Sequence, residues 1–273
     1  MIKSMVVMDR MDRIFCCREG RIMEAYTGFA EVYDLFMEDV PYEVWKEFLV
    51  EMLQKQGIME GLVCELGCGT GKMTRLLAQS GYDMIGIDVS QEMLSIAREQ
   101  ESEGILYLAQ DMRQFELYGT VRAVVSICDS MNYLLEEAEL EQVFRLVNNY
   151  LDPDGIFIFD LNMDYKFRER MGTQTFSEHR EEGSLIWDNY YDEEEKINEY
   201  ALTIFLRQKS GLYRKYEEIH YERCYELSEI MRLLKQAGME FVSACDGEDH
   251  GPVREDSERI YVLARQHGKK IRV

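Results

Sequence analysis

Residues 63–71 read Val-Cys-Glu-Leu-Gly-Cys-Gly-Thr-Gly, and this stretch decides the expected fold. An apolar run over residues 62–66 ends in these glycines, and a helical pattern over residues 73–79 follows. Glycines at 67, 69 and 71 make a turn without side chains, so a ligand can approach the backbone and the free N–H groups of the helix. A dinucleotide fingerprint would place its third glycine at position 72, where this chain has Lys72. The stretch therefore predicts a ligand-binding turn between strand and helix, although such turns also occur where no ligand binds.

Strand and helix patterns alternate after this turn. Apolar runs predict buried strands over residues 83–89, 105–108, 123–128 and 155–161. Helices are expected after Ser90, which fits an N-cap, and over residues 140–150. Strands that are separated by single helices are typical of βαβ units, so we expect a mainly parallel sheet with right-handed crossovers.

The alternation breaks near residue 164. Three strand patterns over residues 184–191, 197–206 and 212–223 predict an antiparallel sheet. A helix over residues 227–236 and strands over 239–245 and 259–264 then resume the α/β pattern. We therefore expect an α/β domain made of residues 23–164 and 226–266, with residues 165–225 as an antiparallel insertion. Residues 1–22 are expected to be a disordered extension, and residues 267–273 a tail.

Composition and charge exclude several classes of protein. The 273 residues carry a net charge of −21, and residues 23–164 alone hold 8 basic and 27 acidic residues. Such an acidic half repels phosphate backbones, which makes a nucleic-acid partner unlikely by charge. No stretch reaches the roughly 20 apolar residues of a membrane span, and we expect no secretory signal in the first 20 residues, which have no apolar h-region. The seven cysteines follow no zinc-ligand spacing, so we expect reduced thiols, no metal site and a cytoplasmic protein.

Three acidic residues follow the predicted strands in register with the glycines. Glu65 precedes the first glycine by two positions, Asp88 ends the second strand, and Asp111 follows the third. An acid at the end of the second strand can accept hydrogen bonds from both ribose hydroxyls of a nucleoside. Each acid by itself also fits a solvated strand end. Together they predict a nucleoside-containing ligand at the carboxyl edge of the sheet.

At this point the chain resembles a known family. The segments ELGCGTG, IGIDVSQEML, AQDMRQF and SICDSMNYL are similar to the successive motifs of class I S-adenosylmethionine-dependent methyltransferases. Similar sequences include uncharacterised Firmicutes enzymes and sugar-amine N,N-dimethyltransferases. The resemblance implies a Rossmann-like α/β fold with a seven-stranded, mostly parallel sheet. It also implies an antiparallel β insertion before the last helix and strands, placed as a substrate lid.

The resemblance implies S-adenosylmethionine as cofactor. Carried over position by position, it implies that the glycine turn wraps the methionine part and that acids hold the amino group, the ribose and the adenine edge. The implied cofactor-binding residues are Tyr26, Tyr33, Glu65, Gly67, Cys68, Gly69, Gly71, Asp88, Val89, Met93, Asp111, Met112 and Cys128. No metal ligand is implied.

The acceptor is expected beside the fourth and fifth strands. Asp129, Tyr133 and Asp160 lie there and are the candidate catalytic residues, although Asp160 also fits a structural cap. His220 in the insertion is a candidate base, but packing is the better interpretation. We expect methyl transfer to a small-molecule amine or hydroxyl. The sequence leaves open a tRNA or protein methyltransferase, a non-catalytic cofactor-binding protein and, more remotely, an NAD or nucleotide-sugar oxidoreductase. It also leaves the oligomeric state open, a homodimer included.

Overall fold

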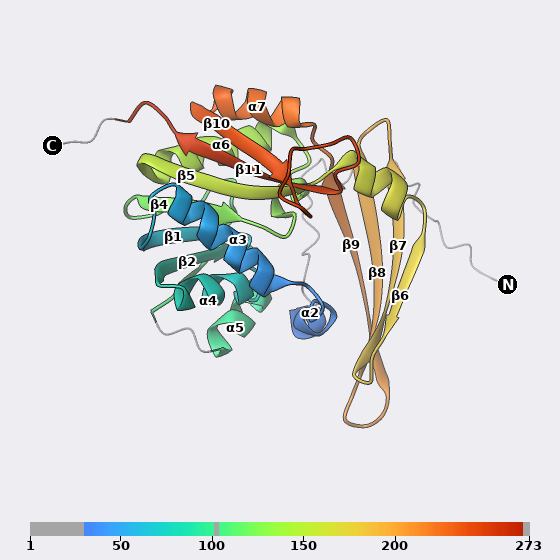
Figure 1. Ribbon diagram of the computed structural model, residues 1–273. Coiled ribbons are helices and arrows are strands. Elements are labelled where there is room, and N and C mark those ends of the chain that lie inside the picture. Colours follow the sequence, from blue (N-terminus) through green and yellow to red (C-terminus); the bar gives the residue numbers. More distant parts are fainter. Residues whose placement is uncertain (1–29, 101–103, 270–273) are drawn as a thin grey trace.

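The central sheet contains seven strands among residues 30–100 and 104–269, which are the residues that the computed structural model describes. The strands are β1 (Gly61–Leu66), β2 (Tyr82–Asp88), β3 (Leu106–Ala109), β4 (Val121–Ser126), β5 (Leu151–Asn162), β10 (Met239–Asp246) and β11 (Arg259–Gln266). Their order across the sheet is β10-β11-β5-β4-β1-β2-β3 (Figure 1). Strands β1 to β5 run parallel to one another, and β11 runs antiparallel to both β5 and β10. The predicted fold class is therefore confirmed.

Helices cover both faces of this sheet. They are α3 (Tyr42–Lys55), α4 (Lys72–Gln79), α5 (Gln91–Glu99), α6 (Glu137–Tyr150) and α7 (Leu227–Gln236). Successive strand side chains point to opposite faces. Accordingly, Val124 belongs to the core under α6 and α7, whereas Val125 belongs to the core under α3 and α4. This alternation explains why the buried strands read as continuous apolar runs.

The chain changes direction at the strand pair β1 and β4. From β1 it continues through β2 to β3 on one side, and it then returns to β4 and β5 on the other side. Open α/β sheets bind ligands in the crevice beyond the carboxyl ends of the strands at such a switch point. The glycine turn follows β1 directly, so the topology places it at the expected binding edge.

A second, antiparallel sheet stands beside this edge (Figure 1). Within the described part of the chain it contains four strands: β6 (Thr175–His179), β7 (Gly183–Asp192), β8 (Ile197–Arg207) and β9 (Tyr213–Arg223). The sequence predicted three of them. It missed β6 because this strand is short and mostly exposed, with Phe176 as its single large apolar residue. The inner face of this second sheet packs against the one-turn helix η2 (Lys166–Met171). It also packs against helix α2 (Ala30–Phe36) through Tyr33 and Phe36.

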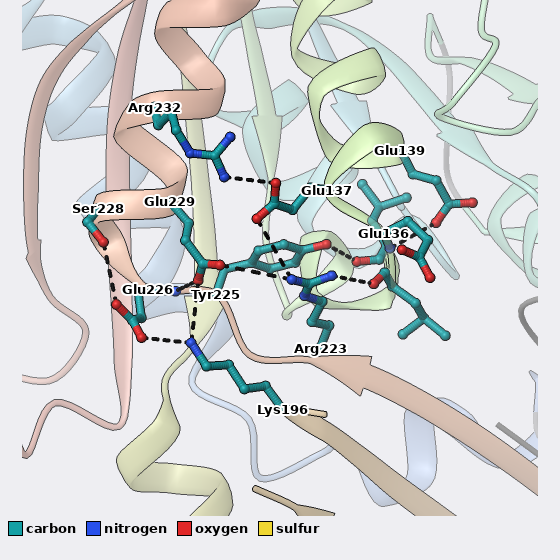
Figure 2. A network of polar contacts seen from close by, with 12 residues as sticks. Glu136, Glu137, Glu139, Lys196, Arg223, Tyr225, Glu226, Ser228, Glu229 and Arg232 are labelled. Atoms are coloured by element: carbon teal, nitrogen blue, oxygen red, sulfur yellow. Dashed lines mark hydrogen bonds and ion pairs between the residues drawn. The ribbon is translucent and has the colours of Figure 1, made fainter. Parts of the chain in front are cut away.

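The insertion rejoins the α/β domain through a polar network (Figure 2). Arg223, at the end of β9, donates a hydrogen bond to the carbonyl oxygen of Leu135 at 3.0 Å, and the hydroxyl of Tyr225 donates to Leu134. Ion pairs surround this point, including Lys196 Nζ to Glu226 at 2.7 Å. The network fixes the root of β9 against α6 and α7.

Candidate active site

The three glycines of the turn serve different purposes. All have positive φ, at +71° for Gly67, +53° for Gly69 and +73° for Gly71. A Cβ on Gly67 would collide with the side chain of Ser130, and one on Gly71 would collide with the ring of Tyr107. A Cβ on Gly69, in contrast, would meet nothing within 4 Å. Two glycines therefore permit close packing, and the third leaves open space above its backbone.

Asp88 lies under the turn and anchors it. Its Oδ2 accepts a hydrogen bond from the N–H of Gly69 at 2.8 Å, and its Oδ1 accepts one from the N–H of Ser90 at 2.9 Å. Burial raises the pKa of Asp88, and these backbone hydrogen bonds oppose that rise. Ser90 in turn caps α5 by accepting from the N–H of Met93 at 3.2 Å, as the sequence predicted. The acid, the turn and the next helix thus form one rigid unit.

Glu65 is the buried acid behind the turn. It is 2% exposed and accepts a hydrogen bond from the hydroxyl of Thr74 on α4. Burial raises the pKa of Glu65 to about 8. A cationic group that reached this carboxyl would favour its ionised form.

Asp111, which the resemblance assigns to the adenine edge, bonds a side chain of its own loop after β3. Both carboxylate oxygens of Asp111 accept from the side chain of Arg113, with Nε at 3.0 Å and a terminal nitrogen at 2.6 Å. Although desolvation alone would raise the pKa of Asp111, the hydrogen bonds from Arg113 lower it. Met112 lies closer to the turn, because its terminal methyl is 3.6 Å from where a Cβ of Gly67 would be. The arrangement makes Asp111 the anchor of the loop and brings Met112 to the turn.

Helix α2 connects the turn to the insertion. The hydroxyl of Thr70 donates to Asp34 Oδ1 at 2.7 Å, while Tyr33 packs against the apolar core of the insertion. Asp34 and Thr70 are site residues that the sequence reasoning missed, although both stand next to residues that it selected. Tyr26 and residues 1–22 lie outside the described residues.

The backbone after β4 is strained. The sequence placed Cys128 at the end of this strand, but β4 ends at Ser126, and Cys128 and Asp129 have positive φ of 59° and 56°. Such conformations cost about 1–3 kcal/mol each for residues other than glycine, and they persist where the surroundings enforce them. The N–H of Asp129 donates to Asp160 Oδ1 at 2.9 Å, and its carbonyl accepts from Asn132 at 2.8 Å. These contacts hold the strained turn in place. The side chain of Ser130, the next residue of the turn, packs against Gly67.

A junction cluster of charged residues lies at this turn, between the two sheets. It consists of Asp129, Asp160, Lys166, Glu222 and Arg259. One terminal nitrogen of Arg259 is 2.6 Å from Asp129 Oδ1, and the other bonds Asp160. Arg259 also lies over the ring of Trp45 at 5.5 Å.

Asn162 joins the remaining members of the junction cluster. Its Nδ2 donates to Glu222 Oε2 at 3.2 Å, and its Oδ1 accepts from Lys166 Nζ at 2.9 Å. The cluster therefore connects the turn after β4 with β5, η2, β9 and β11.

The structure brings two of the three candidate catalytic residues together. Asp129 and Asp160 share Arg259, and Asp160 is completely buried, where burial raises its pKa. Tyr133 makes an edge-to-face contact with His220, with 6.0 Å between the ring centroids, and His220 Nε2 is 3.2 Å from Glu218 Oε2. Sequence reasoning missed Lys166, Glu222 and Arg259, since no local motif marks them.

Comparison with known proteins identifies the family. A profile of the methyltransferase domain matches residues 63–155. An inferred methyltransferase of Geobacillus sp. (strain WCH70) is 33% identical over 246 residues, which are 88% of this chain and 99% of that protein. The crystal structure of an S-adenosylmethionine-dependent methyltransferase from Clostridium acetobutylicum has a TM-score of 0.79 and 29% identity, covering 89% of this chain and 99% of that chain. The chain belongs to the S-adenosylmethionine-dependent methyltransferases.

A third relative of this methyltransferase has a named substrate. It is the dTDP-3-amino-3,6-dideoxy-alpha-D-glucopyranose N,N-dimethyltransferase of Streptomyces fradiae, 29% identical over 138 residues, which are 50% of this chain and 54% of that protein. The similarity thus spans half of each chain. Among the described residues of this methyltransferase, no helix is long and apolar enough to cross a membrane.

Proposed function

We propose that this methyltransferase transfers the methyl group of S-adenosylmethionine to the amine or hydroxyl of a small molecule. The observation that carries the proposal is the open backbone at Gly69, fixed from below by Asp88 at the switch point of the sheet. The sugar-amine relative favours a small acceptor of this kind. The acidic half of the chain favours it over an RNA acceptor.

The residues around the turn fit this cofactor. Gly69 leaves room for the methionine part, Gly67 and Gly71 let the turn pack against Ser130 and Tyr107, and the buried Glu65 carboxyl suits the ammonium group. The remaining lone pairs of Asp88 suit ribose hydroxyls. In the proposed site, Asp111 fixes the loop that carries Met112 to the adenine. The other proposed contacts are Tyr26, Tyr33, Cys68, Val89, Met93 and Cys128.

The bound cofactor supplies a methyl group that is already activated by a sulfonium leaving group. The protein therefore has to align the acceptor, exclude water and leave the acceptor's lone pair free. In our proposal the inner face of the insertion closes the acceptor side as a lid, and Tyr133 and Asp129 border the acceptor. Asp160 acts through Arg259 and the strained turn rather than by contact with the acceptor, since it is completely buried.

Calorimetric titration with S-adenosylhomocysteine, with NAD as the control ligand, tests the cofactor site. We expect saturable binding at one site and no heat from NAD. A screen of amines and alcohols with labelled S-adenosylmethionine then tests the acceptor class. A folded sample that binds neither S-adenosylhomocysteine nor S-adenosylmethionine would overturn the proposal. The cytoplasmic location and the homodimer stay predictions.

A further inference from the structure

The junction cluster contains one more carboxyl group than it has cations. Among the described residues, the cations that face Asp129, Asp160 and Glu222 are Lys166 and Arg259, so full ionisation would leave one negative charge in excess. Asp160 and Glu222 are at most 1% exposed. A buried charge without a counter-charge is costly, and a group in that position gains a proton or a cationic partner instead.

The contacts show which carboxyls share the extra proton. Glu222 and Asp129 are neighbours in the cluster, and the charge of Asp129 comes next after burial among the causes that raise the pKa of Glu222. Two neighbouring buried carboxyl groups disfavour joint ionisation, because their charges repel and ionised carboxylates can only accept hydrogen bonds. Arg259 holds Asp129 in its ionised form, which leaves the proton on Glu222. Burial raises the pKa of Glu222 well above its usual range, and the charge of Asp129 adds to the rise.

The other groups around this carboxyl pair cannot replace that proton. The hydroxyl of Tyr200 on β8 donates to Met171 Sδ at 4.0 Å, and burial, followed by the charge of Glu222, raises its pKa. Burial lowers the pKa of Lys166 on η2, so its ammonium group, which bonds Asn162 beside Glu222, loses its proton more easily than an exposed lysine does. Burial likewise raises the pKa of the neighbouring Cys128 thiol. His220, two residues along β9, has its Nε2 3.2 Å from Glu218 Oε2.

The pair stands next to the proposed cofactor site. Asp129 precedes Ser130, whose side chain lies against Gly67 of the glycine turn. The sulfonium of S-adenosylmethionine is a permanent cation with no hydrogen to donate, and methyl transfer converts it to a neutral thioether. A cation of this kind is what the junction cluster lacks.

We propose that the Asp129–Glu222 carboxyl pair exchanges its shared proton for the positive charge of the cofactor. Glu222 gives its proton to solvent when S-adenosylmethionine binds, and the ionised pair then faces the acceptor. The acceptor's lone pair forms the new bond to carbon, the carbon–sulfur bond leaves its electrons on sulfur, and the N–H or O–H proton of the methylated acceptor passes to the pair. The pair is then neutralised by one proton again. This inference rests on the proposed function.

Proton release on binding tests the inference without turnover. Calorimetric titration in buffers of different ionisation enthalpy gives the number of protons released by each ligand. S-adenosylmethionine and S-adenosylhomocysteine carry the same amino acid, ribose and adenine, so a contribution from Glu65 cancels in their difference. We expect S-adenosylmethionine to release more protons at pH 7, with a difference approaching about one per chain.

Two variants locate the difference. In Glu222→Gln the difference should vanish, because the amide keeps hydrogen bonds but cannot titrate. Glu199→Gln is the matched control, since Glu199 is a buried carboxyl on the neighbouring strand β8 and is paired in register with Tyr221. It should keep the wild-type difference.

The outcomes separate the two proposals. Equal proton release by both ligands, or a difference that survives Glu222→Gln, overturns the exchange and leaves the methyltransferase function standing. Absence of binding by both ligands overturns the cofactor site itself. If Glu222→Gln does not fold, a pH series on the wild-type protein replaces it. The difference must then fall as the pH rises and the free protein loses the shared proton, and a constant difference contradicts the proposal.

Discussion

The two halves of the binding edge are built on different principles. Beyond β1, β2 and β3, the protein presents backbone: a glycine turn, with acids that bond to N–H groups of this turn and of their own loops. Beyond β4 and β5, it presents a largely buried cluster of charged side chains that come from the turn after β4 and from β5, η2, β9 and β11. The first half is specified locally and tolerates little change in shape. The second half depends on the balance of charges across the whole fold.

Removing the central cation of the second half should have the largest effect. Arg259→Met leaves the buried Asp160 and the half-buried Asp129 without their partner, and breaking a buried pair typically costs about 3–5 kcal/mol of the free energy of unfolding. Urea denaturation measures this loss. Arg265→Met is the matched control, because Arg265 lies on the same strand but bonds the amide of Gln56. Equal losses in the two variants would show that the cluster is no more important than the rest of β11.

Filling the open space of the first half should abolish cofactor binding. Gly69→Trp projects a side chain where a Cβ meets nothing within 4 Å, so we expect affinity for S-adenosylhomocysteine to fall more than about 100-fold, or about 2.7 kcal/mol. Gly57→Trp controls for backbone strain, because Gly57 also has positive φ and open surroundings but lies at the end of α3. Calorimetry on both variants checks the prediction, and normal binding by Gly69→Trp would place the site elsewhere.

The pH dependence of S-adenosylhomocysteine binding tests Glu65 separately from the junction cluster, because this ligand lacks the sulfonium charge. Burial raises the pKa of Glu65 to about 8, so at lower pH this carboxyl is neutral and attracts an ammonium group weakly. A ligand cation favours the ionised form, and affinity for S-adenosylhomocysteine should therefore rise with pH, by at most about tenfold per unit, until about pH 8. Titrations from pH 6 to 8 measure this slope. Glu65→Gln should bind with a smaller slope, and an unchanged slope would exclude Glu65 from the ammonium site.

The same contrast explains what could be predicted from the sequence. Glu65, Asp88 and the glycines of the turn lie within 24 residues of one another, and their spacing follows strand and helix lengths. The partners in the junction cluster, Asp129 and Arg259, are 130 residues apart. Arg259 opens an ordinary apolar strand and Glu222 is the last residue but one of an aromatic strand, so no local pattern marks either residue. Their roles depend on tertiary contacts, which a single sequence does not display.

The smallest effect is expected where the insertion meets solvent. Lys196→Met removes one cation, as Arg259→Met does, but Lys196 pairs with an exposed carboxylate of Glu226 at 2.7 Å in the network of Figure 2. Exposed pairs contribute about 0.2–1 kcal/mol and weaken as salt increases. Urea denaturation at low and high salt should show a small loss that shrinks with salt, while the loss in Arg259→Met persists. Lys196→Met could instead destabilise the protein as strongly as Arg259→Met. The polar network of Figure 2 would then stabilise the fold as much as the junction cluster does, and burial would not explain the difference in their contributions.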